Sequence, residues 1–332
     1  MTPADLSLTV LRAVRRAVGD GVLRAVEVPR RVVVERPRPG GCGDWATNAA
    51  LQLAGPAALP PRRVAEVLRE RLLDAPGIER VDITGPGFLN LTLRADTRAE
   101  GDQLLVERVL AEKGRYGHGE ALRHLDAALV SFPPPGEPRL AVLTDTVVTL
   151  LRSQGAPARV TTDGAQELHA LPAHYDVHAA LGPDAARWAL LRPAPHDRVL
   201  DAEPLLRQSE AVNSLFTVQY AHSRARALLR NAAALGVDSA YEVPVDAAVL
   251  TGALVDHASV LLGAARHRAP DRLARHLEAT ADALLGFQHT VLPRGDEKPT
   301  AAHRSRLALA EAAGTVLAGG LSLLGISAPD HL

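Results

Sequence analysis

Long helical segments dominate the C-terminal part of this 332-residue chain and limit what it can fold into. From Glu203 onward, apolar residues recur at the spacing of an α-helix, and proline or glycine separates one segment from the next. The four segments lie at residues 209–234, 244–262, 270–291 and 301–324. Each has an apolar face that must be covered, so the sequence predicts an all-helical bundle over residues 203–332.

The first 112 residues have a different pattern, which predicts a small α/β domain. Both helical spacing and short β-branched or alternating runs occur there. The expected helices are 3–18, 46–53 and 62–73, and the expected strands are 32–35, 78–83 and 88–93. Residues 113–202 are less regular, with a candidate strand at 127–132 and candidate helices at 144–152 and 185–191. The predicted fold class is therefore α+β and mainly α, in three parts: 1–112, 113–202 and 203–332.

Composition excludes several classes of protein. The net charge is −1 and 47% of residues are hydrophobic, so neither a disordered chain nor a bulk basic coat for nucleic acid is expected. Residues 203–332 carry 12 Lys and Arg against 13 Asp and Glu. Cys42 is the single cysteine, so no disulfide and no cysteine-based metal cluster is expected. No apolar run suggests a signal peptide or a membrane span, and we expect a cytoplasmic protein without metal or cofactor.

One predicted helix, residues 213–230, carries a candidate site for nucleic acid. Five residues are expected on or near one face of that helix: Phe216, Gln219, Tyr220, Ser223 and Arg224. An aromatic ring beside an arginine and an amide suits stacking on an unpaired base together with a phosphate contact. The alternative is that Phe216 and Tyr220 belong to the core and that Arg224 is simply solvated.

Two other patterns are less specific. Residues 41–46 match G-x-G-x-x-A, a dinucleotide fingerprint, but no acidic residue ends a second strand about 20 positions further on. His174 and His178 have the i, i+4 spacing of a metal pair, but a third ligand is not evident. A surface pair of histidines is the simpler interpretation.

Residues 219–224, QYAHSR, resemble the start of the anticodon-binding helical domain of arginyl-tRNA synthetases. The resemblance continues through residues 270–275 and 281–287 and through LSLLGISAP at 321–329. It implies that tRNA contacts the bundle through Gln219, Tyr220, Arg224, Arg275 and Phe287.

The N-terminal part resembles the additional N-terminal domain of the same family. The resemblance rests on three stretches: ERP at 35–37, GDWATNAA at 43–50 and GPGFLNL at 85–91. In that family the domain contacts the tRNA elbow and D-loop. The implied contact residues are Asp44, Trp45, Asn48, Phe88 and Asn90.

The middle of the chain departs from the family, because residues 113–202 are too few for a class I catalytic core. Residues 128–138 resemble the segment that leads into the H-x-G-H motif, which would fall on Arg139, Leu140, Ala141 and Val142. The family's lysine motif would lie just upstream of residues 181–190, and neither of the two lysines, Lys113 and Lys298, is near it. Residues 113–202 are therefore expected to be a truncated remnant of the core.

The anticodon-binding part also departs from the family pattern. Thr217 and Gln288 stand where the family commonly has tyrosines, and Leu332 replaces a terminal methionine. The favoured hypothesis is a tRNA-binding paralogue of arginyl-tRNA synthetase that does not activate arginine and acts as a regulatory or delivery factor. Its expected partners are tRNA, with arginine-accepting tRNA as a candidate species, and a synthetase or another tRNA-dependent enzyme, but neither DNA nor a membrane. The alternatives are an arginine–tRNA ligase-type or other tRNA-dependent activity through unrecognised residues, and a protein-interaction module that binds a synthetase.

Overall fold

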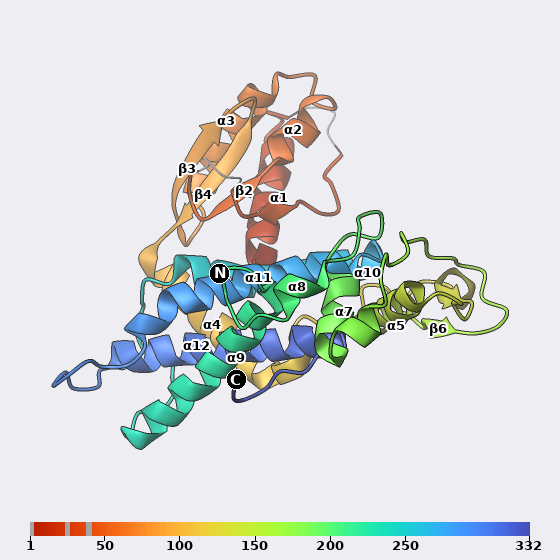
Figure 1. Cartoon of the computed structure of the whole chain (residues 1–332). Helices are drawn as coiled ribbons and strands as arrows, with labels where there is room; N and C mark the ends of the chain where they lie inside the picture. The colour runs from red at the N-terminus through yellow and green to blue at the C-terminus, as the bar shows by residue number, and fades with distance from the viewer. Residues whose placement is uncertain (1–2, 24–26, 38–41) are drawn as a thin grey trace. The chain divides into compact units, whose positions relative to one another are not determined.

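The computed structural model describes residues 3–23, 27–37 and 42–332, which form two compact units, residues 1–104 and 105–332 (Figure 1). The first unit is a small sheet with helices, and the second is mostly helical. The fold is α+β and mainly α, as predicted. The predicted middle part, 113–202, lies in the same compact unit as the bundle.

The first unit is built on a four-stranded antiparallel sheet with the order β1-β2-β4-β3. Its strands are β1 (Val34–Glu35), β2 (Trp45–Thr47), β3 (Ile78–Thr84) and β4 (Phe88–Leu93). Its helices are α1 (Pro3–Gly19), α2 (Ala49–Ala54) and α3 (Pro61–Leu73), and α4 (Ala95–Glu112) leads out of it. Gly87, with a φ of 147°, lies in the β3–β4 turn, and a Cβ there would come 2.9 Å from the Pro61 carbonyl oxygen. The turn therefore requires glycine.

The second unit begins with short elements and ends with the long helices of the bundle. The short elements are η1 (Lys113–Arg115), η2 (Ala127–Val130), β5 (Ser131–Phe132), β6 (Arg159–Val160), α6 (Val177–Ala180), α8 (Ala202–Leu205) and η3 (Gln288–Thr290). The longer helices are α5 (Pro138–Ser153), α7 (Pro183–Leu191), α9 (Ser214–Ala234), α10 (Ala248–Arg266), α11 (Pro270–Phe287) and α12 (Ala301–Leu323). Helix α9 packs against α11 and α12, and α10 packs against α11 (Figure 1).

Local sequence explains where the bundle helices begin. The Asn213 side chain caps α9 by accepting a hydrogen bond from the Phe216 amide at 3.0 Å. Pro270 is in the first turn of α11, where its missing N–H costs nothing. Thr300 and His303 form a reciprocal capping box at the start of α12.

Residues 113–202 and the bundle share one apolar core. Trp188 of α7 is fully buried in it, and its indole Nε1 donates to the Ser214 hydroxyl at the start of α9. Arg192 makes a two-pronged ion pair with Glu278 of α11, with N–O distances of 2.8 and 2.9 Å. The short middle segment is therefore held to the bundle by packing and by directed polar contacts.

Two sequence expectations need correction. The helix expected at 46–53 starts at Ala49, because Trp45–Thr47 is a strand that pairs with β4. The strand expected at 127–132 is mainly a 3-10 turn, with only Ser131 and Phe132 in a two-stranded parallel sheet. Among the described residues, α10 is long and apolar enough to cross a membrane, but that is weak evidence, since core helices of soluble proteins pass the same test.

Candidate nucleic-acid interface

An aromatic pair lies half-buried on α9. The rings of Phe216 and Tyr220 stack with a centroid distance of 5.6 Å and an interplanar angle of 8°. The two residues are one helical turn apart, so their rings are neighbours on the same face. Neither ring is a fully buried core residue, and the pair offers partly exposed π-surface to solvent.

Arg224 lies one further turn along the same face and is held in place by the bundle. Its Nε donates to Oε1 of Gln288 in η3 at 2.8 Å. Arg224 is half-buried, and Gln288 stands at one of the positions where the family commonly has tyrosine. An amide acceptor therefore orients the Arg224 guanidinium.

Gln219 has a structural task in this fold. Its amide nitrogen donates to Oδ2 of Asp184 in α7 at 3.1 Å and to the carbonyl oxygen of Ser327 at 3.0 Å. Asp184 in turn accepts from the Ser327 amide at 3.2 Å. Gln219 thus joins α9, α7 and the C-terminal tail, and its donors are occupied.

The structure does not bring the other two predicted bundle residues to this face. Phe287 is only 8% exposed, so it supports the start of η3 from within the core. Arg275 is exposed and pairs with Asp271 at 3.0 Å. It lies 12 residues before Phe287, the last residue of α11, which is ~18 Å along the helix axis from the end that carries Gln288. The local cluster is therefore Phe216, Tyr220 and Arg224 with Gln288.

Three of the predicted residues in the first unit hold its sheet together. Asn90 is buried and donates to the Thr84 hydroxyl at 2.8 Å. Asp44 accepts from the Leu93 amide at 2.8 Å and from Arg98 at 3.3 Å. Trp45 is also buried.

The remaining candidates of the first unit are closer to its surface. The buried Trp45 differs from them, because the Arg36 guanidinium carbon lies over its ring, 4.3 Å from the ring centroid. Asn48 and Phe88 are half-buried, and the Asn48 amide oxygen accepts from Gln52 at 3.0 Å. Of the five predicted residues, Trp45 and Asn90 are therefore buried, while Asp44, Asn48 and Phe88 are half-buried.

Arg139, which the sequence resemblance predicts at the place of the first motif histidine, is buried. It is 1% exposed, and its guanidinium donates to four backbone carbonyl oxygens. The acceptors and distances are Leu171 at 2.6 Å, Asp197 at 2.9 Å, Ala194 at 3.1 Å and Leu190 at 3.3 Å. Burial lowers the pKa of Arg139, but an arginine remains charged at neutral pH. Its donors are used by the protein and are not directed at a phosphate.

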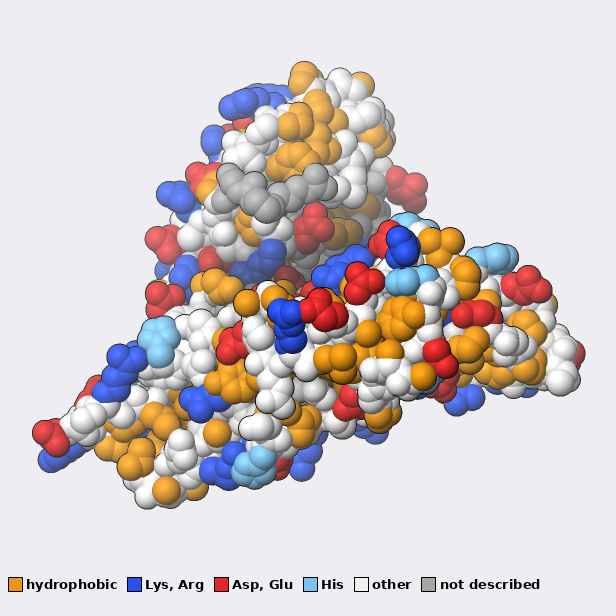
Figure 2. Space-filling view, viewed as in Figure 1, with side chains coloured by type: hydrophobic (Ala, Val, Ile, Leu, Met, Phe, Trp, Pro, Cys, Tyr) orange, Lys and Arg blue, Asp and Glu red, His pale blue; other side chains and the backbone are white. Residues whose placement is uncertain are grey.

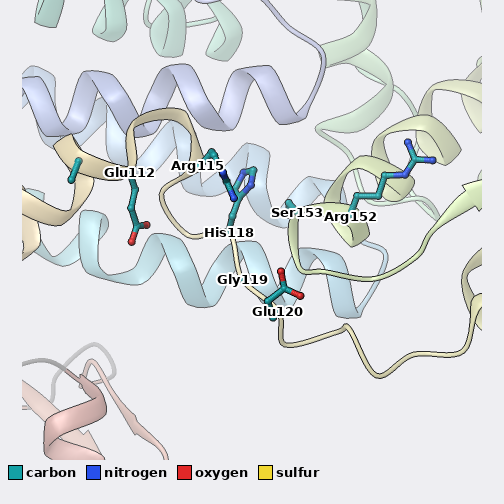
Figure 3. A pocket seen from close by; sticks show the side chains of 8 residues that line it. Glu112, Arg115, His118, Gly119, Glu120, Arg152 and Ser153 are labelled. Atoms are coloured by element: carbon teal, nitrogen blue, oxygen red, sulfur yellow. The ribbon is translucent and has the colours of Figure 1, made fainter.

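A hollow of about 510 Å³ lies beside η1 and the end of α5 and has mixed charge (Figure 3). Arg115 and His118 lie close together on one side, while Arg152 points away from them (Figure 3). Glu112 pairs with Arg108 at 2.8 Å, and Nε of Arg152 donates to the Ala158 carbonyl at 2.7 Å. These cations do not converge on one point, so the hollow has no evident anion site.

The remaining sequence motifs find little support as sites. Within residues 3–23, 27–37 and 42–332, no group of three His, Cys, Asp or Glu is placed to hold a metal. His174 precedes the four-residue helix α6 that contains His178, and it contacts Asp201 at 3.2 Å instead. Gly41 of the G-x-G-x-x-A motif lies outside the described residues.

Comparisons with known proteins agree with this arrangement. Residues 9–93 match the model of the arginyl tRNA synthetase N terminal domain, and residues 218–332 match that of the DALR anticodon binding domain. The two matched regions correspond to the sheet unit and to the bundle from α9 onward. This chain is a relative of the arginyl-tRNA synthetases.

The relatives are longer than this synthetase-related chain. The arginine–tRNA ligase of Renibacterium salmoninarum is 27% identical in an alignment of 555 positions that covers all of both chains, although this chain has 332 residues. The arginine–tRNA ligase of Clavibacter sepedonicus is 38% identical over 228 residues, which are 66% of this chain and 40% of the relative. In fold, the chain is similar to the arginyl-tRNA synthetase of Thermus thermophilus, with a TM-score of 0.68 and 13% identity over all of both chains.

The surface of the bundle carries mixed charge in this synthetase relative. In Figure 2, Lys and Arg side chains alternate with Asp and Glu over the visible face of residues 105–332. A bundle with 12 basic and 13 acidic residues has no broad positive field, so any RNA contact depends on a few local cations. Sequence patterns alone did not identify Lys113 and Asp330 as charged groups that lie beside α9. They are distant from the helix α9 in sequence, and only the fold brings them to it.

Proposed function

We propose that this chain is a tRNA-binding relative of arginyl-tRNA synthetase that does not activate arginine and that works in the cytoplasm as a regulatory or delivery factor. The observation that carries the proposal is the half-exposed stack of Phe216 and Tyr220 beside the oriented Arg224. An exposed ring face can stack on an unpaired base, and a guanidinium can contact the adjoining phosphate.

The bundle in which this cluster lies supports tRNA as the ligand. It matches the anticodon binding domain, and the arginine–tRNA ligases to which the chain is similar act on tRNA by their names. Asn48 and Phe88 of the first unit are proposed as a second, separate contact with the same tRNA.

The environment of Arg139 supports the absence of arginine activation. Phosphate chemistry needs donors directed at the charge that develops in the transition state. Arg139 directs its donors at four carbonyl groups, and Val142 has no donor on its side chain. Lys113 and Lys298, the two lysines of the chain, both lie outside the remnant helices α5 and α7.

Two assays test the two halves of the proposal. Gel-shift titration with arginine-accepting tRNA is expected to give a saturable complex that weakens in Tyr220→Ala. Arginine-dependent exchange of pyrophosphate into ATP is expected to stay at the background of a no-enzyme control. Clear exchange would support the ligase-type alternative, and binding to a synthetase without binding to tRNA would support the protein-interaction alternative.

A further inference from the structure

A second hollow of the bundle lies on the other side of α9 from the aromatic pair. It has a volume of about 530 Å³ and lies between α9, α12 and η1. Small apolar residues such as Ala225 and Ala318 line it, and Lys113, Arg226, Glu311 and Asp330 are its charged residues. Its volume is within the usual range for small-molecule sites.

Polar groups of α9 converge on Asp330 at the edge of this hollow. Arg226 Nε donates to the Asp330 carboxylate at 3.0 Å, and both terminal nitrogens of Arg230 reach its carbonyl oxygen at 3.3 Å. The Ser223 hydroxyl also donates to that carbonyl at 3.3 Å. The Arg226 hydrogen bond lowers the pKa of Asp330, which is therefore ionised at neutral pH. The C-terminal tail thus places the Asp330 carboxylate and carbonyl on donors of α9 that could bind another anion.

His222 adds little to the hold on this carboxylate. Its Nδ1 lies 3.1 Å from the carbonyl oxygen of Gly314, which requires the proton on Nδ1. Burial lowers the pKa of His222, and its Nε2 lies 3.6 Å from the Asp330 carboxylate. This distance is longer than a normal hydrogen bond, so the His222 contact is weaker than the 3.0 Å contact from Arg226.

The end of the tail is weakly held as a whole. Leu324 and Ile326 are buried, and Ser327 is fixed by Gln219 and Asp184. Beyond them, the Asp330 side chain is 52% exposed, and its partner Arg226 is 46% exposed. Ion pairs this exposed contribute little in water, so a stronger anion can replace Asp330 while the inner tail stays in place.

Lys113 supplies an unused cation on another wall of the hollow. It is exposed, and no hydrogen bond or ion pair engages its ammonium group among the described residues. Its φ of 53° is a left-handed conformation that is unusual for a residue other than glycine. The adjoining Gly114 packs closely on Gly319 of α12, where an added Cβ would come 3.2 Å from the Gly114 carbonyl oxygen. This packing fixes the backbone of η1 beside the hollow.

We infer that this hollow is a binding site for one unpaired nucleotide of an RNA, and that Asp330 occupies the place of its phosphate until RNA binds. The base would lie over the small apolar residues of α9 and α12, and Glu311 would accept a hydrogen bond from an exocyclic amine. The phosphate would be bound by Arg226, Arg230 and Lys113. This inference rests on the proposed tRNA binding, and it adds a site separate from the Tyr220 face.

Titration of tRNA against two variants and their matched controls tests the inference. Asp330→Asn removes the competing anion, and we expect tRNA to bind several-fold more tightly than to wild type. The slope of log K against log salt should also become steeper, by ~0.7 for each additional phosphate that the protein neutralises. Lys113→Ala should weaken binding several-fold. The controls are Asp296→Asn and Lys298→Ala, which alter an exposed aspartate and the other lysine outside the hollow.

The outcomes separate this inference from the proposed function. The nucleotide site would be overturned if Asp330→Asn bound tRNA no more tightly than wild type and Lys113→Ala had the same affinity as Lys298→Ala. In that case, tRNA binding by the wild type would leave the proposed function intact. If Asp330→Asn binds tRNA and the wild type does not, the result would support the nucleotide site and show that Asp330 blocks it. Absence of binding by wild type and by every variant would overturn both. Circular dichroism of each variant checks that it is folded.

Discussion

Arg224 on α9 donates from Nε to Oε1 of Gln288 in η3 at 2.8 Å. This contact joins two residues that are 64 positions apart, and it sets the direction of the Arg224 guanidinium on the helix face that carries the Phe216–Tyr220 stack. The sequence resemblance predicts a tyrosine of the family at position 288, and the residue present there is an amide that orients an arginine. The face therefore combines two stacked rings with an oriented guanidinium.

Removal of the ring at position 220 tests the stacking part of the proposal. Tyr220→Ala is expected to weaken tRNA binding by about 1–3 kcal/mol, the usual loss for one stacked base. Tyr220→Phe keeps the ring and should bind within about twofold of wild type. Fluorescence anisotropy with labelled tRNA measures both. Equal affinity for wild type and Tyr220→Ala, with both folded, would contradict a stacking role.

The hydrogen bond between Arg224 and Gln288 gives a second prediction. Gln288→Ala leaves the charge of Arg224 but removes its orientation, and we expect a loss of ~0.5–1.5 kcal/mol in tRNA binding. Arg224→Lys should lose a similar amount because an ammonium lacks the planar fork of donors. If Arg224 and Gln288 act together, the double variant Arg224→Ala/Gln288→Ala should lose no more tRNA-binding free energy than Arg224→Ala alone. Fully additive losses would show that the two residues act independently.

Arg139 should be important for stability and not for RNA binding. Arg139→Ala removes the donors of four buried carbonyl groups, and we expect the free energy of unfolding of the second unit to fall by about 3 kcal/mol or more. Arg123→Ala, an exposed arginine in the same segment, should change it by less than about 0.5 kcal/mol. Urea unfolding followed by Trp188 fluorescence in a Trp45→Phe background gives the comparison. Similar midpoints for the two variants would mean that the carbonyl groups do not need Arg139.

A buried pair of histidines predicts how stability depends on pH. The rings of His257 and His276 are 5.3 Å apart between α10 and α11, and Tyr116 stacks on His257. Burial, with a smaller effect of the nearby His276 and His118, lowers the pKa of His257 to about 3. Burial lowers the pKa of His276 to about 4. Both rings are therefore neutral in the folded protein and take up protons on unfolding.

The sign of the effect follows from these lowered values. Stability is complete above the unfolded pKa of about 6.5 and falls as the pH drops below it, by about 1.4 kcal/mol for each histidine between pH 7.5 and pH 5.5. His257→Phe should reduce this dependence by about half. The measurement is urea unfolding of the second unit at both pH values. Equal stability of the wild type at pH 7.5 and 5.5 would contradict the burial of neutral rings.

Sequence was sufficient for the features that local chemistry determines. The four bundle helices follow from helical spacing and from prolines and glycines between them, and the β3–β4 hairpin follows from alternation around a Gly-Pro-Gly turn. Helix α4 was not predicted, because only Val106 and Val109 of its 18 residues are buried and no clear apolar stripe marks it. The strand Trp45–Thr47 was also missed, because pairing with β4, more than 40 residues away in sequence, overrides local propensity.

The candidate site could be predicted only in part for the same reason. Phe216, Tyr220 and Arg224 share a helix face, so their spacing was enough to place them together. Whether Phe287 is buried depends on packing between helices, and spacing does not specify it. The four acceptors of Arg139 come from residues 32 to 58 positions further along the chain, and Asp330 reaches α9 from about 100 residues away. Contacts this distant in sequence are determined by the tertiary fold.

Equilibrium titration of wild-type protein with arginine-accepting tRNA at physiological salt tests the central claim most directly. We predict a saturable complex with a dissociation constant below ~10⁻⁶ M, tighter than typical non-specific binding, and loss of most of that affinity in Tyr220→Ala/Arg224→Ala. A dissociation constant weaker than ~10⁻⁴ M for the folded wild type, with no difference from the double variant, would contradict the account.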